Sequence, residues 1–266
     1  MKLEQADILI TIYTCFANTK HGRRLANEIR YARYNNANVS NQEWVNLLGS
    51  DVNNLSHMLV TACLTEDFCS ITQKYQPGFL SEKERALLSV AAVIHDQGEA
   101  IIGDITYSDK NNKHEVQEEQ AFKKFQDEFS PNLPFEIKEQ ITLARSQVVF
   151  NSHTKLGKAF NAIERIGYLR TALRAEFLLE SKKAGNSAPG LRWLVADVLT
   201  NQICQLVKYS KTYVAVNKYL ADNNVRISRA FSSIRAEDFA SYSKDQKSES
   251  VEALNDAQVI WSKWNR

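Results

Sequence analysis

The spacing of apolar residues predicts helices along almost the whole chain. Over residues 4–16 apolar side chains recur every three or four positions, as on one face of a helix. The same spacing predicts helices over 21–34, 41–48, 82–97, 114–129, 157–180, 191–221 and 235–264, and one more after Gly49 that carries Leu55, Met58, Leu59, Ala62 and Cys63. No stretch alternates between apolar and polar residues as a half-buried strand does, and no internal repeat is visible. The pattern therefore predicts an all-α protein.

Turn signals divide this helical pattern. The Asn-rich stretch 35–42 and the Pro-Gly pair at 77–78 are typical of turns, and Ser81 with Glu84 three residues later is a capping box. The stretch 181–190 is the best linker in the chain. We therefore expect an N-terminal helical extension over 1–40, a main domain over 41–180, and a C-terminal helical extension over 191–266 that packs on it.

Composition narrows the class of protein. The chain has 266 residues, of which 44% are hydrophobic and 24% charged, and its net charge of +2 gives no reason to expect a surface that coats nucleic acid. The four cysteines form no C-x-x-C pair, which is typical of reduced cytosolic thiols. No signal peptide is recognisable, and the longest apolar run is too short to span a bilayer. We expect a soluble, cytoplasmic protein without membrane contact.

The most informative stretch is AAVIHDQGEAIIGDI, residues 91–105, where an apolar helical run ends in His95 and Asp96. Glu99 follows three residues after Asp96, and Asp104 follows five residues after Glu99. These groups are costly to bury among Ala, Val and Ile without a partner. A divalent cation is a partner that satisfies imidazole and carboxylate donors together. The pair His95–Asp96 lies in the last turn of the helix predicted over 82–97, and His95 and Glu99, four positions apart, are expected on one face of that helix end.

Two donors are too few for a tight metal site, so a further ligand must come from another segment. His57 is the natural candidate, because it lies on a separate predicted helix within the otherwise apolar stretch SHMLVTACL. By itself His57 would be read as a hydrogen-bonded core histidine. Its pairing with the His95–Asp96 doublet favours a shared metal site.

These residues resemble the HD-domain metal-dependent phosphohydrolases. The string H-D-x-x-E-A-I-I-G-D-I is especially similar to the branch that contains the 5'-deoxynucleotidases, and the resemblance covers roughly residues 40–180. It implies an HD-domain helical bundle with extra N- and C-terminal helices, a divalent metal ion (Mn, Co, Mg, Fe, Ni or Zn) held by His57, His95 and Asp96, and a small phosphorylated substrate, with a nucleoside 5'-monophosphate favoured. It also implies that Glu99 and Asp104 are the catalytic carboxylates.

One position departs from the family pattern. The family takes its last metal ligand, an Asp, from a later helix, and the matching position here is Asn161. Three interpretations stay open at this point. Asn161 is a weaker fourth ligand through its carbonyl oxygen, or the carboxylate comes from Glu164 one turn later, or the site is degenerate. In the last case the chain is a non-catalytic HD-like module that binds a nucleotide or a protein partner.

Substrate-binding residues are harder to identify. The resemblance places an Arg-Trp pair before the first His, and Glu43-Trp44 stands in that neighbourhood. Trp44 either stacks on a base or packs in the core. Lys113 and Arg33 are candidate phosphate contacts, whereas we expect nearby Arg30 on a solvated helix face. A nucleoside triphosphohydrolase, which uses the same HD ligands, is a further alternative function, and the C-terminal helices leave room for a homodimer.

Overall fold

The computed structural model describes residues 4–30, 40–49, 52–103, 112–129, 133–181, 189–239 and 244–266. These residues are helical almost throughout, and within them the extended backbone pairs at an isolated antiparallel bridge between Ile29 and Asn53. The prediction of an all-α protein is confirmed. The helices are α1 (Gln5–Ala17), α2 (Lys20–Asn27), α3 (Asn41–Leu48), α4 (Asn54–Tyr75), α5 (Glu82–Ala92), α6 (Glu99–Ile102), α7 (Asn112–Phe129), α8 (Phe135–Ala144), η2 (Arg145–Val149), α9 (Lys155–Ser181), α10 (Pro189–Tyr209), α11 (Val214–Asp222), α12 (Asn224–Ser233), η4 (Ala236–Phe239) and α13 (Lys244–Trp264).

The chain divides into two compact units. The first comprises Met1–Arg33 and Asp51–Asn161, and the second comprises Tyr34–Ser50 and Ala162–Arg266. The long helix α9 thus contributes its first two turns to one unit and the remainder to the other. These units group residues that contact one another and do not test the predicted domain boundaries at 40, 180 and 191, which stay a prediction.

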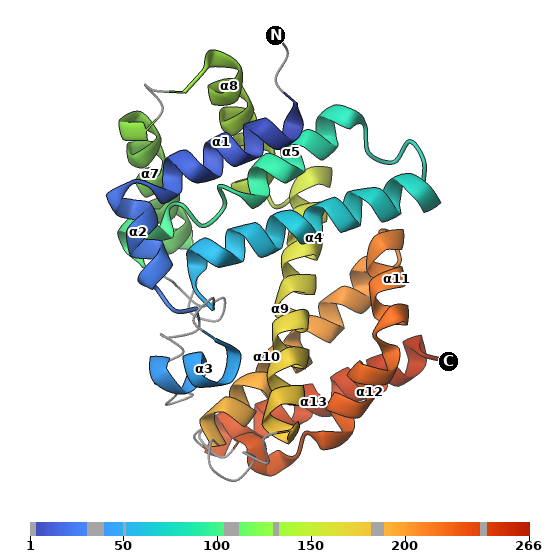
Figure 1. Cartoon of the computed structure of the whole chain (residues 1–266). Helices are drawn as coiled ribbons and strands as arrows, with labels where there is room; N and C mark the ends of the chain where they lie inside the picture. The colour runs from blue at the N-terminus through green and yellow to red at the C-terminus, as the bar shows by residue number, and fades with distance from the viewer. Residues whose placement is uncertain are drawn as a thin grey trace. The chain divides into compact units, whose positions relative to one another are not determined.

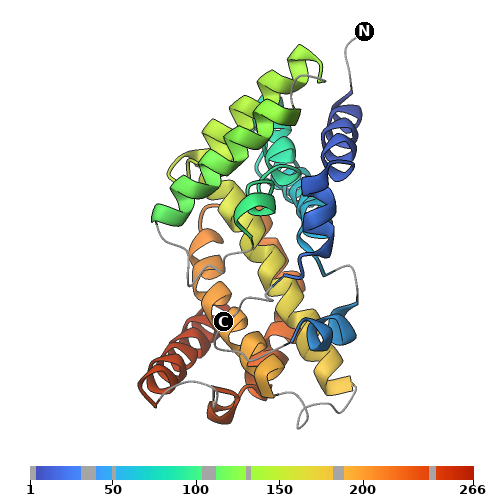
Figure 2. The same ribbon diagram turned by 90° about the vertical axis from the view of Figure 1, so that its left-hand side faces the viewer.

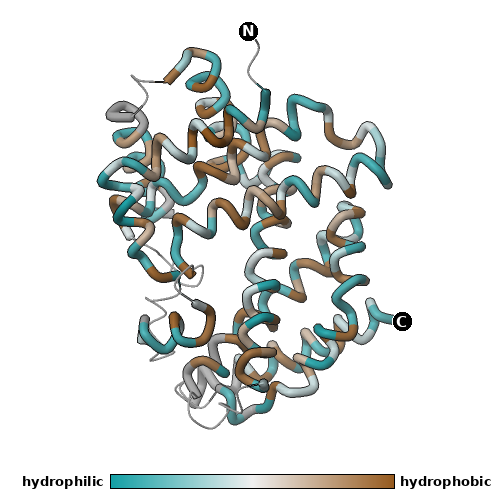
Figure 3. Tube along the Cα trace, in the orientation of Figure 1, coloured by the Kyte–Doolittle hydropathy of each residue, from teal (hydrophilic) through white to brown (hydrophobic). Residues whose placement is uncertain are grey.

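In the first unit α4 and α5 lie side by side, with α1 and α8 also packed against α5 (Figure 1). Helix α2 contacts both α4 and α6, and α6 contacts α7. The second half of α5 is buried, and it is drawn largely brown in Figure 3. The largest fully buried side chains of this unit are Phe16, Phe68, Phe122, Phe125, Ile12, Leu25, Met58, Leu88, Ile94 and Ile137. This apolar packing holds the elements that carry the candidate site.

In the second unit α10 packs against α11, α13 and η4 (Figure 2). Helix α13 is attached through two indoles: Trp261 donates to Ser228 Oγ at 3.0 Å, and Trp264 donates to Ser210 Oγ at 3.1 Å. The two indole rings stack on each other with centroids 5.0 Å apart. The predicted C-terminal helix therefore forms, and buried Trp N–H groups find the partners they need.

Two predicted helices end earlier than the apolar spacing indicates. The helix expected over 21–34 ends at Asn27, because Ile29 leaves the helix to pair with Asn53. The helix expected over 82–97 begins at its predicted capping box, Ser81 with Glu84, but ends at Ala92. Neither end is marked by Gly or Pro, so local sequence signals could not place them.

Two further boundaries differ in the C-terminal region. The helix expected over 191–221 is interrupted between Tyr209 and Val214, where Tyr213 adopts an extended backbone. The helix expected over 235–264 is preceded by the short helix η4 and begins at Lys244. None of the helices in the described ranges combines the length and hydropathy that crossing a bilayer requires.

Candidate metal centre

Two separate elements bring the three predicted metal donors together. His57 lies in the first turn of α4, and His95 and Asp96 lie in the turn that follows α5. His57 Nε2 is 3.8 Å from Asp96 Oδ2, and His95 Nε2 is 3.2 Å from Asp96 Oδ1. All three donor atoms lie within 4.8 Å of one another. The three side chains are between 4% and 9% exposed, so the cluster is buried.

The backbone orients the imidazole of His95 for metal binding. His95 Nδ1 lies 3.0 Å from the carbonyl oxygen of Ala92, in the last turn of α5. A ring nitrogen can approach a carbonyl oxygen this closely only as an N–H donor, so the proton is on Nδ1 and the lone pair is on Nε2. That lone pair faces the Asp96 carboxylate. Two electron-rich groups placed in this way fit a shared cation, and a histidine whose second nitrogen donates to a carbonyl is the usual arrangement at metal sites.

The turn after α5 allows adjacent residues to reach one site. Three backbone hydrogen bonds there span only three residues each, from Ile94, Gln97 and Glu99 to the carbonyls of Ala91, Ile94 and Asp96. The prediction that His95 and Glu99 share one face of a continuing helix is therefore wrong. In a regular helix neighbouring side chains point about 100° apart. The turn instead brings the donor atoms of His95 and Asp96 within 3.2 Å.

Gly98 allows this turn to lie against α7. A Cβ at Gly98 would lie 2.8 Å from the carbonyl oxygen of Glu118 and 2.9 Å from the Glu118 Cγ. Any other residue would push the turn away from α7 and would move the neighbouring Asp96 and Glu99 with it. The glycine in the HDQGE string is thus explained by close packing.

Arg30 is a site residue that the sequence interpretation missed. We expected it on a solvated helix face, but it is 9% exposed and its Nη1 donates to Asp96 Oδ2 at 2.8 Å. Its backbone is held in place, because Arg30 N donates to Val52 O and Asn54 N donates to Glu28 O, on either side of the Ile29–Asn53 bridge. This short pairing anchors Arg30 to the start of the helix that carries His57.

Asn54 joins the metal-ligand cluster to Glu99. The Asn54 side chain is fully buried, and its Nδ2 donates to Glu99 Oε2 at 2.7 Å. Its Oδ1 accepts a long hydrogen bond of 3.5 Å from Arg30 Nη1. Arg30 and Asn54 therefore connect the carboxylates of Asp96 and Glu99. The sequence signal for this residue was the Asn53–Asn54 pair before a predicted helix, which reads only as a helix cap.

Burial and neighbouring charges determine the ionisation of the cluster. Burial lowers the pKa of His57 well below its usual range, and the nearby Arg30 lowers it further, so this imidazole is neutral and can ligate a metal. Burial acts to raise the pKa of Asp96, but the neighbouring His95 imidazole and the charge of Arg30 outweigh it and hold that pKa well below its usual range. A neutral imidazole and an ionised carboxylate are the forms that bind a divalent cation.

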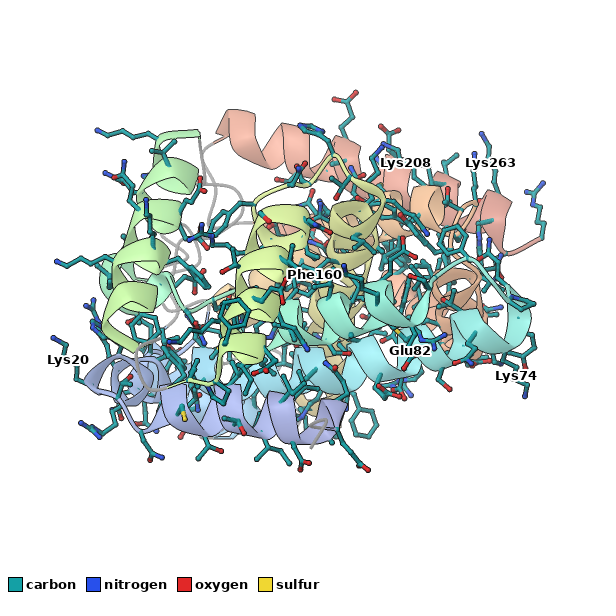
Figure 4. All side chains as sticks on the ribbon, turned by 90° about the horizontal axis from the view of Figure 1, so that it is seen from above. Lys20, Lys74, Glu82, Phe160, Lys208 and Lys263 are labelled. Carbon is teal, nitrogen blue, oxygen red and sulfur yellow. The ribbon has the colours of Figure 1, made fainter. Side chains whose placement is uncertain are left out.

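The remaining predicted ligand, Asn161, is half-buried in α9. The preceding residue, Phe160, packs its ring edge-to-face on His95 with centroids 5.4 Å apart. Figure 4 shows Phe160 among the helices of this unit, whereas the labelled Lys20 and Lys74 point away from the ribbon. This start of α9 is therefore next to the cluster, and ligation by Asn161 stays a prediction.

The remaining predicted residues are Asp104, Arg33, Lys113 and Trp44. Asp104 and Arg33 lie outside the described residues. Lys113 is exposed in the first turn of α7. Trp44 is 3% exposed in α3, in the second unit, and such burial is what core packing predicts. The roles of these residues in substrate binding or catalysis stay predictions.

Comparison with known proteins adds one finding. A family model described as the HD domain matches residues 48–174. No curated protein and no solved structure matches. The matched segment contains the three clustered donors, Glu99 and Asn161, and it begins after Arg30 and Trp44. The family match supports the resemblance at the level of the HD domain and does not distinguish the 5'-deoxynucleotidase branch.

Proposed function

From the HD domain over residues 48–174, we infer that this chain is a metal-dependent phosphohydrolase. We propose that it removes phosphate from a small phosphorylated metabolite, with a nucleoside 5'-monophosphate as the favoured substrate. The observation that carries the proposal is the convergence of His57, His95 and Asp96, from two separate segments, within 4.8 Å. Buried imidazole and carboxylate groups in this arrangement are typical of a site for a divalent cation.

In this proposal His57, His95 and Asp96 hold the metal, and Asn161 completes the set as a neutral ligand. A divalent metal held there would lower the pKa of a coordinated water to about 7 and polarise a phosphoryl oxygen. The protein supplies the orientation. Ala92 fixes the tautomer of His95 through its carbonyl, and the Asn54 amide holds one oxygen of Glu99.

We assign Glu99 the handling of the attacking water. Glu99 is 7% exposed, and the hydrogen bond from Asn54 restricts the rotation of its carboxylate. A carboxylate held in this way can accept a proton from water without first losing conformational freedom. Asp104 is the proposed partner on the leaving-group side. Lys113, Arg33 and Trp44 are the proposed contacts to phosphate and base.

A second candidate function is supported by two residues. Asn161 stands where the family pattern has a negatively charged ligand, and Arg30 already supplies a positive charge to Asp96. Both features reduce the attraction of the site for a metal ion. A non-catalytic HD module that binds a nucleotide or a protein partner therefore remains the alternative.

Metal content and phosphate release separate the two functions. The protein is purified without chelator and its Mn, Co, Ni, Zn, Fe and Mg are measured. It is then assayed for phosphate release from 5'-monophosphates and triphosphates of all nucleosides, with Mn²⁺ or Co²⁺ added. The hydrolase proposal predicts bound metal, release from one or more monophosphates, and loss of activity in chelator that added metal restores.

The control is a histidine outside the cluster. His57→Ala and His95→Ala are expected to lose metal and activity, whereas His153→Ala, at an exposed position, is expected to retain both. Wild-type protein that binds no metal and hydrolyses no substrate in the panel would favour the binding module. Release from triphosphates alone would favour the triphosphohydrolase.

A further inference from the structure

The placement of Arg30 points to a role that the HD family match does not assign, because this residue lies outside the matched segment. Arg30 Nη1 is 2.8 Å from Asp96 Oδ2, the same oxygen that lies 3.8 Å from His57 Nε2. The guanidinium therefore approaches the carboxylate on the side that also faces one of the two imidazoles. A cation bound between His57 and Asp96 has to share that carboxylate with Arg30.

We propose that Arg30 is an internal counter-ion that competes with the metal for Asp96, so that metal occupancy of this site is conditional. This inference rests on the metal site of the proposed function. Without metal, the Arg30 guanidinium neutralises a buried carboxylate. With metal, the same guanidinium is a like charge next to a divalent cation and weakens its binding.

The need for a counter-ion follows from burial. The Arg30 and Asp96 side chains are 11% and 9% exposed, and an isolated carboxylate at such a position would carry a large desolvation cost. Glu99, also buried, adds a second negative charge nearby, where Asn54 connects it to Arg30. An empty site of this composition folds more readily with a positive charge inside it.

The rigidity of Arg30 makes it an effective competitor. Its backbone is paired with Val52 on the strand-like stretch that leads into α4, next to the Ile29–Asn53 bridge. The side chain is thus delivered to Asp96 from a fixed base. Metal binding has to overcome a positioned charge, and at close range in a partly buried site two cations repel strongly.

The test compares metal affinities of apo-proteins. Wild type, Arg30→Met and Arg30→Gln are stripped with chelator and titrated calorimetrically with Mn²⁺ and with Co²⁺. Removal of the positive charge is expected to tighten metal binding about tenfold or more in both variants. Arg30→Lys keeps a charge and is expected to bind metal with nearly wild-type affinity. Arg23→Met, which removes an exposed arginine of α2, is the matched control and should change nothing.

Thermal unfolding supplies a second readout. In chelator, Arg30→Met and Arg30→Gln should unfold at lower temperature than wild type, because Asp96 loses its counter-ion. Saturating Mn²⁺ should raise their unfolding temperature by more than it raises that of wild type, since tighter ligand binding adds more stability. A lower unfolding temperature without metal, together with a larger increase on adding metal, distinguishes competition for Asp96 from simple damage to the fold.

The outcomes separate this inference from the proposed function. If wild type binds metal and both neutral variants bind it equally or more weakly, Arg30 is not a competitor, and the hydrolase proposal stands. If neither wild type nor the variants bind metal, the metal site itself is refuted, and both proposals fall. If only the neutral variants bind metal, the counter-ion role is supported, and the natural chain is the binding module.

Discussion

Each unit of the molecule contains a cluster around a buried acidic group, and the two clusters are held in different ways. In the first unit, Asp96 is paired with a buried arginine and two histidines that come from other segments. In the second unit, Glu176 shares a hydrogen bond with Glu180 of the same helix and accepts one from Ser233 of α12 at 3.1 Å. Glu180 in turn pairs with Arg229, whose side chain is 63% exposed.

The difference lies in the ionisation of the central acid. Burial raises the pKa of Glu176, and Glu180 raises it further. The second unit thus holds Glu176 in an environment that disfavours its charge, whereas the groups around Asp96 favour its ionised form, which Arg30 neutralises. Ser233 and Arg229, both in α12, attach this carboxyl pair of α9 to a second helix. Only the first cluster combines an ionised carboxylate with imidazole donors, and this is the chemistry that a metal needs.

The largest expected effect is on stability when each cluster loses one carboxylate. Asp96→Ala leaves the Arg30 guanidinium buried and uncompensated, so we expect a loss of about 3 kcal/mol or more in the free energy of unfolding. Glu180→Ala removes a pair with an exposed arginine and should cost about 1 kcal/mol or less. Urea unfolding in chelator measures both. Equal losses of unfolding free energy would show that the Arg30–Asp96 pair is no better shielded from solvent than the Arg229–Glu180 pair.

The next effect tests the proposed catalytic role of Glu99 through Asn54, which donates a hydrogen bond to it. Asn54→Ala should lower kcat by about 10- to 100-fold, as losses of groups that orient site residues do, while bound metal is retained. Steady-state kinetics and metal analysis measure this. Asn53→Ala is the control, because it removes the N-cap bond to Ser56 and should cost about 1 kcal/mol of stability without lowering kcat. A parallel fall of kcat in both variants would indicate a structural role only.

A smaller effect is expected at Asn161. If this side chain is the weakened fourth ligand, Asn161→Asp adds a negative charge to the site and should tighten Mn²⁺ binding about tenfold, since metal affinity rises with the charge of the ligand set. Calorimetric titration measures the change. An unaltered affinity would exclude Asn161 as a ligand, and Glu164→Gln would then test the shifted alternative.

The smallest expected effect is on how stability depends on pH through Glu176. Because the pKa of Glu176 is raised on folding, its contribution to stability is fully present below the unfolded pKa and is lost as pH rises through the folded value. Glu176→Gln cannot ionise and should lack this loss. The difference in unfolding temperature between the variant and wild type should therefore move in favour of the variant from pH 4 to pH 8. A difference that stays constant would mean that Glu176 is not perturbed.

Local sequence patterns predicted much of the fold. The capping box at Ser81 and Glu84 marked the true start of α5, and the apolar spacing located α1, α3, α7 and α9 to within a few residues. The same patterns did not predict where α2 and α5 end. At both points the chain leaves a helix to make a contact with a distant segment, Ile29 with Asn53 and Gly98 with Glu118. Gly98 is compatible with a close contact but does not identify Glu118 as its partner, and no residue near the end of α2 indicates the pairing with Asn53.

The candidate site divides in the same way. His57, His95 and Asp96 were predicted because donor residues in apolar surroundings are rare and need a partner. Arg30 and Asn54 were missed, since an arginine in a polar stretch and an asparagine before a helix have common and sufficient local explanations. Their burial beside Asp96 and Glu99 changes that interpretation.

The sequence by itself therefore predicted the helical class, most helix positions and the three candidate metal donors that lie together, because periodicity and polar groups in apolar surroundings are local properties. Only the tertiary structure decided that His95 and Asp96 leave the helix in a tight turn, that they meet His57, and that Arg30 occupies one face of the carboxylate. Those facts depend on contacts between residues far apart in the chain, and such contacts are set by the packing of the whole unit.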